Sequence, residues 1–140
     1  MPATRLTLLQ FFYAYGVALA VMGALDAIWL GWLAIDFYKK EMGPLMADRV
    51  RVVPAALYYL LYPLAIVYLA LVPAQSLGEG VLRSLVLGLA AFGVYDMTCL
   101  AVMRGYTVKL ALVDLAWGGF ASLVGGASAY AVVVGRYARS

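Results

Sequence analysis

A chain of 140 residues, of which 66% are hydrophobic and only 12% are charged, has too much apolar surface to fold as a soluble globule. Its composition therefore indicates an integral membrane protein. The formal charge of +3 comes mostly from Lys and Arg at the ends of apolar runs, where such side chains reach lipid headgroups, so we expect membrane lipids as partners and no nucleic acid.

Four stretches are long enough to cross a bilayer, which takes about 20 apolar residues. We place these helices at residues 7–33, 52–74, 82–103 and 108–134. The first run is far longer than the apolar core of a signal peptide and contains Asp26, so we expect a retained helix. The last two helices are joined by only a few residues around Gly105 and must form an antiparallel hairpin. The predicted fold is an all-α membrane protein, a four-transmembrane-helix antiparallel bundle that forms one domain over residues 1–140.

The longest polar segment, residues 35–51, lies between the first two spans. It contains both basic residues and apolar or aromatic ones, and Gly43-Pro44 divides it into two short pieces. We expect a short interfacial segment, with an ordinary charged connector as the alternative.

Tyrosines gather in the first half of the second span. Tyr58 and Tyr59 lie near its start, where an aromatic belt is the simplest interpretation. Tyr62 lies deeper and is followed by Pro63, whose missing N–H frees a carbonyl and can kink the helix.

The fourth span carries small residues at every fourth position, namely Gly118, Ser122 and Gly126. Such a stripe lets another helix backbone come close. Asp114 lies four residues before Gly118 on the same stripe, so its carboxyl group is predicted to face helices and not lipid.

Three acids lie inside the apolar spans. Asp26 and Asp96 come about seven residues before their helix ends and Asp114 about six after its start, which places all three roughly 10 Å below one surface at about 1.5 Å per residue. Trp29 and Trp117 each follow an acid by three residues and share its helix face. We therefore expect the three acids to converge in one layer of the bundle.

No basic residue lies at the depth of this layer, so only bound protons can neutralise the charge of the acids there. Three carboxylates in a low-dielectric layer cannot all stay ionised, so at least one should carry a proton, with tyrosine hydroxyls and Thr98 as hydrogen-bond partners. The candidate ligand- or proton-binding residues are Asp26, Asp96, Asp114, Tyr58, Tyr62, Tyr95, Trp29, Trp117 and Thr98. The alternative is that the acids are structural pins that hold the helices together.

Other reactive chemistry is scarce. The chain has no histidine, which excludes histidine-ligated metal or haem and Ser-His or Cys-His catalysis, and we expect no metal and no cofactor. Cys99, the only cysteine, cannot form an intramolecular disulfide and is predicted to be a packing residue.

Three motifs together resemble DUF2177, a family of small, functionally uncharacterised bacterial membrane proteins. They are Pro54-Ala-Ala-Leu-Tyr-Tyr-Leu-Leu-Tyr62, Tyr95-Asp-Met-Thr98 and Val113-Asp-Leu-Ala-Trp-Gly118. Cys99 stands where the resemblance leads us to expect Asn. The resemblance implies a multi-pass protein of the bacterial inner (plasma) membrane and brings no activity or catalytic residue.

Three functions remain open on the sequence. The first is a site that binds an amphipathic or cationic small molecule, in which carboxylates and aromatic faces suit an organic cation. The second is a membrane enzyme of lipid modification that uses paired Asp residues as general acid and base. The third is a non-catalytic subunit of a membrane complex, and a homo-oligomer is compatible with the sequence.

Orientation follows from the basic residues. Four lie on the side of the termini (Arg5, Arg83, Arg136 and Arg139) and six on the other side (Lys39, Lys40, Arg49, Arg51, Arg104 and Lys109). The positive-inside rule therefore predicts both termini outside and the acid layer towards the cytoplasm.

Overall fold

The computed structural model describes residues 6–45 and 51–137, with side chains up to Val133 in the last helix. Within these residues every regular element is helical: α1 (Leu8–Ile28), η1 (Trp29–Leu33), α2 (Ile35–Met42), η2 (Gly43–Leu45), α3 (Val52–Ala65), η3 (Ile66–Leu71), α4 (Leu77–Val102) and α5 (Val108–Tyr137). Here η1 and η3 are π-helical turns that continue α1 and α3, and η2 is a short 3-10 turn. Four of the described helices are long and apolar enough to cross a membrane, which confirms the predicted fold class.

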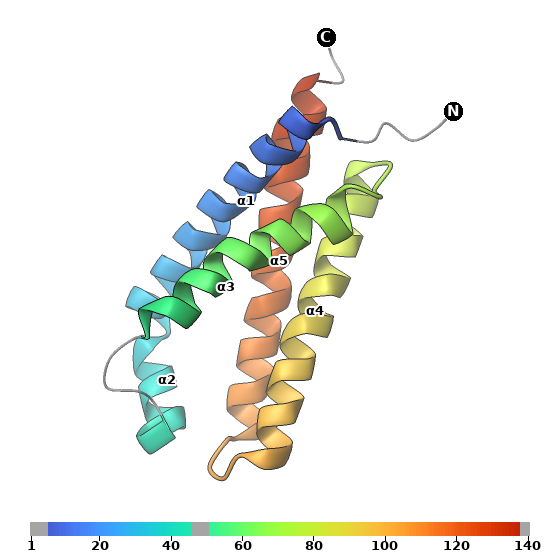
Figure 1. Cartoon of the computed structure of the whole chain (residues 1–140). Coiled ribbons are helices and arrows are strands. Elements are labelled where there is room, and N and C mark those ends of the chain that lie inside the picture. The colour runs from blue at the N-terminus through green and yellow to red at the C-terminus, as the bar shows by residue number, and fades with distance from the viewer. Residues whose placement is uncertain (1–5, 46–50, 138–140) are drawn as a thin grey trace.

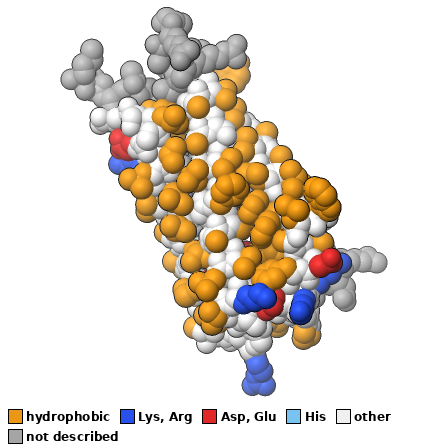
Figure 2. Space-filling model, turned by 180° about the vertical axis from the view of Figure 1, so that it is seen from behind, with side chains coloured by type: hydrophobic (Ala, Val, Ile, Leu, Met, Phe, Trp, Pro, Cys, Tyr) orange, Lys and Arg blue, Asp and Glu red, His pale blue; other side chains and the backbone are white. Residues whose placement is uncertain are grey.

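The helices run antiparallel, and both ends of the described chain lie at the same end of the bundle (Figure 1). The α4–α5 turn and α2 lie at the opposite end (Figure 1). Apolar side chains cover the length of the molecule and charged side chains gather near its two ends (Figure 2). This distribution is the one that a protein immersed in hydrocarbon requires. Arg5, Arg49 and Arg139, which enter the orientation prediction, lie outside the described residues.

Three helix boundaries differ from the sequence prediction by three residues or more, and one of them is the end of α5 at Tyr137 in place of residue 134. α4 begins at Leu77 and not near residue 82, because the Ser76 hydroxyl accepts a hydrogen bond from the Glu79 N–H at 3.1 Å and caps the helix. Glu79 and Arg83 interrupt the apolar run but pair with each other at 2.9 Å, so both are compatible with the first turns. The second span ends with η3 at Leu71, slightly before the predicted residue 74.

α3 crosses the bundle obliquely (Figure 1). Pro63 lies buried inside α3 and cannot donate a backbone hydrogen bond, and the helix widens into η3 three residues later. η3 packs against α4, whereas α3 packs mainly on α1. The first half of the second span therefore diverges from α4.

The closest helix contact joins α4 and α5 through small residues on both. The predicted α5 stripe (Gly118, Ser122 and Gly126) faces a matching α4 stripe (Gly80, Ser84 and Gly88). A Cβ atom on Gly88 would lie 2.6 Å from the Ser122 Cβ and 2.8 Å from the Gly118 carbonyl oxygen. The two backbones can approach this closely only because these side chains are so small.

α1 packs on the adjacent face of α5. Its buried residues recur at every fourth position, from Ala14 through Ala18 and Met22 to Asp26. Gly125 of α5 makes room for Met22, since a Cβ atom there would lie 2.6 Å from the Met22 Cγ. Asp26 therefore ends the stripe that faces α5.

The segment after η1 forms α2 and then breaks at Gly43, whose φ of 51° is a left-handed conformation that favours glycine. α2 packs over the start of α5, where the Thr107 hydroxyl donates to the Glu41 carboxylate at 2.9 Å. Tyr38 and Ala34 of α2 share a small buried cluster with Leu110 of α5. The helical break is as predicted, and its location in the membrane interface stays a prediction.

Candidate functional site

Asp96 and Asp114 face each other where the two stripes end. Asp96 follows the α4 stripe and is 0% exposed, and Asp114 precedes the α5 stripe. The Asp96 carboxyl group lies beside that of Asp114. Two adjacent carboxylates repel each other in a site that excludes water, so this arrangement favours a proton between them.

Two tyrosine hydroxyls complete the pair from the side of α2 and the α4–α5 turn. The Tyr106 hydroxyl donates to Asp96 Oδ1 at 2.6 Å, and the Tyr38 hydroxyl donates to Asp114 Oδ1 at 2.9 Å. Burial raises the pKa of both hydroxyls, and for Tyr106 the hydrogen bond to Asp96 raises the pKa further. Both phenols therefore stay protonated and act as donors. The second oxygen of Asp96, Oδ2, is buried and has no hydrogen-bond donor among the described residues.

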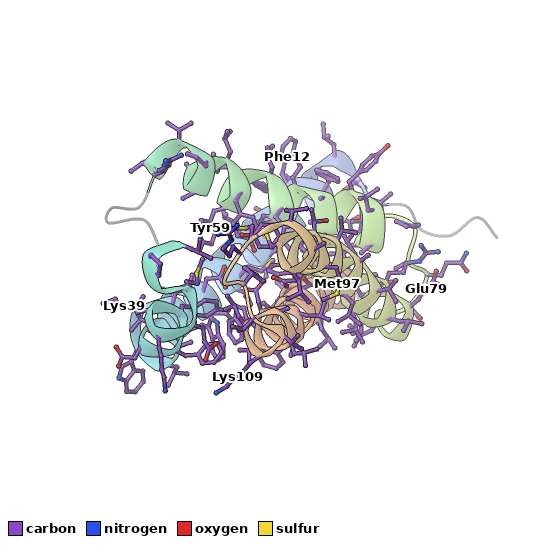
Figure 3. The ribbon with its side chains drawn as sticks, turned by 90° about the horizontal axis from the view of Figure 1, so that it is seen from below. Phe12, Lys39, Tyr59, Glu79, Met97 and Lys109 are labelled. Atoms are coloured by element: carbon purple, nitrogen blue, oxygen red, sulfur yellow. The ribbon has the colours of Figure 1, made fainter. Side chains whose placement is uncertain are left out.

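Asp26 lies apart from this pair. Its Oδ1 accepts a hydrogen bond from the Trp117 indole N–H at 2.8 Å, and the Tyr59 hydroxyl also interacts with the carboxyl group. Tyr59 lies on the side of α3 that faces the other helices, whereas Lys109 points away from the bundle (Figure 3). No three acidic, Cys or His side chains within residues 6–45 and 51–137 are placed to hold one metal ion. The structure thus pairs two of the three acids and connects Asp26 to them through aromatic side chains.

Stacked indoles provide that connection. The rings of Trp29 and Trp117 are parallel within 5°, with centroids 4.4 Å apart. Trp117 of α5 donates to Asp26 of α1, as described above. Trp29, next to α1, donates at 3.3 Å to the Tyr38 hydroxyl, which in turn donates to Asp114 of α5. Each tryptophan is therefore linked by hydrogen bonds to the acid of the other helix. Trp117 bonds Asp26 directly, and Trp29 is linked to Asp114 through the Tyr38 hydroxyl.

A pocket of about 380 Å³ opens beside Asp114 between α3, α4 and α5, and its lining consists of Tyr58, Tyr62, Ala91, Phe92, Tyr95 and Asp114. The rings of Tyr58 and Tyr62 stack with centroids 5.6 Å apart, and Phe92 meets the Tyr62 ring edge-on at 5.7 Å. The Tyr62 hydroxyl is hydrogen-bonded to Ser122 Oγ at 2.6 Å, which fixes this wall. The pocket therefore combines aromatic surfaces with one carboxyl group.

The structure brings together most of the residues that the sequence suggested. Asp96 and Asp114 form the acid pair. Around it lie Trp29, Trp117 and the tyrosines of the pocket. Thr98 does not: it is exposed, and no described side chain is hydrogen-bonded to it. Thr98 comes two residues after Asp96, and this spacing places it on the opposite side of the helix.

Three tyrosines near the acids were missed. Tyr38 and Tyr106 lie in connecting segments, and Tyr59 was assigned to an aromatic belt. The sequence could have predicted the position of Tyr106, because the short α4–α5 turn keeps this residue next to the end of α4, where Asp96 lies. Cys99 is half-buried and packs against the cluster that contains Tyr38 and Tyr106, as predicted for a packing residue.

The apolar helices define a multi-pass membrane protein. The chain belongs to the family described as "Predicted membrane protein (DUF2177)", which matches residues 11–131. That range includes the three acids and the whole pocket lining. No curated protein and no solved structure matches the chain.

Proposed function

We propose that this protein binds an amphipathic organic cation at the pocket beside Asp114 and exchanges it for the proton held by Asp96 and Asp114. The bacterial inner membrane, which the family resemblance implies, is the location that we propose. The observation that carries the proposal is a carboxyl group among four aromatic rings, backed by a second carboxyl group with an unpartnered buried oxygen.

The lining suits an organic cation for two reasons. Aromatic faces attract quaternary or protonated amines, and the attraction grows to about 2 kcal/mol where water is excluded. Tyr58, Tyr62 and Tyr95 supply such faces, and the Asp114 carboxylate supplies the opposite charge.

Proton exchange follows from the pairing of the acids. With the pocket empty, the pair keeps a proton because two adjacent negative charges are unfavourable in a dry site. A bound cation stabilises the doubly ionised pair and so displaces that proton. By linkage, the affinity for the cation rises with pH and binding releases a proton.

Binding of tritiated decyltrimethylammonium to protein in lipid nanodiscs tests the proposal. Empty nanodiscs correct for partition into lipid, and an uncharged isostere with a tert-butyl head competes for any site that recognises shape alone. We expect saturable binding that the isostere does not displace, tighter binding at higher pH, and proton release that a pH indicator detects in weak buffer. Binding that the isostere displaces equally, or that does not depend on pH, would contradict the proposal.

Tyr95→Ala and Tyr68→Ala form a matched pair for this assay. Both tyrosines are exposed within a span, but only Tyr95 lines the pocket. Loss of one aromatic wall should weaken binding about threefold to thirtyfold, which corresponds to the usual strength of a cation–π contact. Tyr68→Ala should bind like the wild type.

A lipid-modifying enzyme is the second candidate, and the Asp96–Asp114 contact is the observation that favours it. Two carboxyl groups that share a proton can act as general acid and general base. An altered lipid composition in a deletion strain, restored by the wild type but not by Asp96→Asn, would favour this function over simple binding.

A further inference from the structure

The acid pair is closed towards the end of the bundle where α2 lies. The hydroxyls of Tyr38 and Tyr106 cover the two carboxyl groups from that side, and both tyrosines are buried. α2 is fixed there by Glu41, which accepts from Thr107 and lies 3.9 Å from the Lys109 ammonium group. A ligand in water at that end therefore meets packed side chains in front of the carboxyl groups.

The pocket is open in a different direction, between α3 and α4. Tyr95 is 56% exposed and Tyr58 is 36% exposed, and Ala91 between the two helices is exposed as well. This opening exists because α3 diverges from α4 while η3 remains packed on it. Tyr95 lies seven residues before the end of α4 at Val102, which is roughly 10 Å along the helix. The opening therefore faces acyl chains and not water.

Resting on the proposed function, we infer that the ligand is a single-tailed amphiphilic cation that comes from the bilayer, with its headgroup in the pocket and its tail left among the lipids between α3 and α4. The volume of about 380 Å³ is at the small end of the range for ligand pockets, so it suits a headgroup and the first carbons of a chain. The charge of Asp114 selects a cationic head, and the lateral opening selects a molecule that already partitions into the membrane.

Tail length tests this inference. Alkyltrimethylammonium ions with tails from octyl to tetradecyl are compared in the nanodisc assay, with their partition measured in empty nanodiscs. A tail that stays in lipid makes the same contacts bound and unbound. The dissociation constant calculated from the ligand concentration in the bilayer should then stay constant within about twofold. The affinity calculated from the ligand concentration in water should rise about fourfold for each added methylene. Tetramethylammonium, which has no tail, should not bind measurably.

Two outcomes would overturn the inference and leave the proposed function in place. One is an affinity, calculated from the ligand concentration in the bilayer, that rises with tail length, because the tail would then bind inside the protein. The other is tight binding of tetramethylammonium, because the site would then be reached from water. If no cation of the series binds, the proposed function falls, and this inference falls with it.

Two neighbouring alanines on α4 locate the tail. Ala91 lines the pocket opening, whereas Ala90 lines a separate groove with Leu69 and Val86. Both are exposed, so tryptophan fits the helix surface at either position. Ala91→Trp should weaken binding of the decyl compound at least tenfold and Ala90→Trp less than twofold. The reverse pattern would place the tail in the other groove and contradict the inferred path.

Discussion

Trp117 of α5 donates its indole N–H to Asp26 of α1 at 2.8 Å, which joins the two helices. The bond satisfies a buried carboxyl group and the N–H of a half-buried indole at the same time, and the stacked Trp29 ring holds the indole in place. In the repeated motif Asp-x-x-Trp, the tryptophan is thus linked by hydrogen bonds to the acid of the other helix and not to the acid of its own motif.

Removal of that bond should destabilise the protein. Trp117→Phe leaves the ring contact but removes the donor, so the free energy of unfolding should fall by about 1–3 kcal/mol. Trp29→Phe removes only a longer bond to the Tyr38 hydroxyl and should cost less. Unfolding in mixed micelles measures both. In an Asp26→Ala background most of the Trp117→Phe cost should vanish, and full additivity would show that the bond contributes nothing.

The α4–α5 contact predicts opposite effects for two glycines. A Cβ atom on Gly88 would collide with Ser122 and the Gly118 carbonyl, so Gly88→Ala should destabilise by about 1–3 kcal/mol through forced separation of the helices. Gly16 of α1 has nothing within 4 Å of the added atom, and Gly16→Ala should be neutral or stabilising by up to about 1 kcal/mol. Melting temperatures of the two variants compare them directly. Equal effects would contradict the packing described here.

Much of this fold is readable from apolar length alone, because each span must satisfy its backbone hydrogen bonds internally and short turns leave only antiparallel neighbours. The inward direction of Asp114 was also predictable, since it shares a face with Gly118 and Ser122. The α4 stripe follows the same rule: Gly80, Ser84 and Gly88 lead at four-residue intervals to Asp96. That periodicity, applied to both helices, would have paired the two acids.

Other parts of the site depend on tertiary structure. The position of Asp26 relative to the pair is set by how α1 packs on α5, which sequence spacing does not determine. Tyr38 reaches Asp114 only because α2 folds over the start of α5. The pocket arises from the oblique path of α3 before Pro63, and no local pattern specifies that angle.

The shared proton has a spectroscopic signature. Infrared spectra at neutral pH should contain a protonated-carboxyl band, because Asp96 and Asp114 lie side by side in a site that excludes water. The band should disappear or shift in Asp96→Asn and in Asp114→Asn. Asp26→Asn serves as the comparison, since this acid is apart from the pair and accepts from an indole. A spectrum without any such band would show that the pair is ionised.

Membrane orientation is a separate prediction. The basic residues near α2 and the α4–α5 turn outnumber those near the termini, so we expect both termini outside the cytoplasm. A C-terminal fusion to a reporter that is active only in the cytoplasm should give no signal, and a fusion to alkaline phosphatase should be active. The opposite result would place the acid pair near the outer surface.

The most direct measurement of the account is cation binding by Asp114→Asn and Asp114→Ala, made together with melting temperature. Asn keeps the shape and can still accept from Tyr38, but it cannot ionise, so Asp114→Asn should melt within about 3 °C of the wild type. It should bind decyltrimethylammonium at least tenfold more weakly, release no proton and fail to complement a deletion strain. Ala also leaves the Tyr38 hydroxyl without an acceptor for its proton and should lower the melting temperature as well. A fully active Asp114→Asn protein with wild-type binding would contradict the account, because the acid would then be a structural pin.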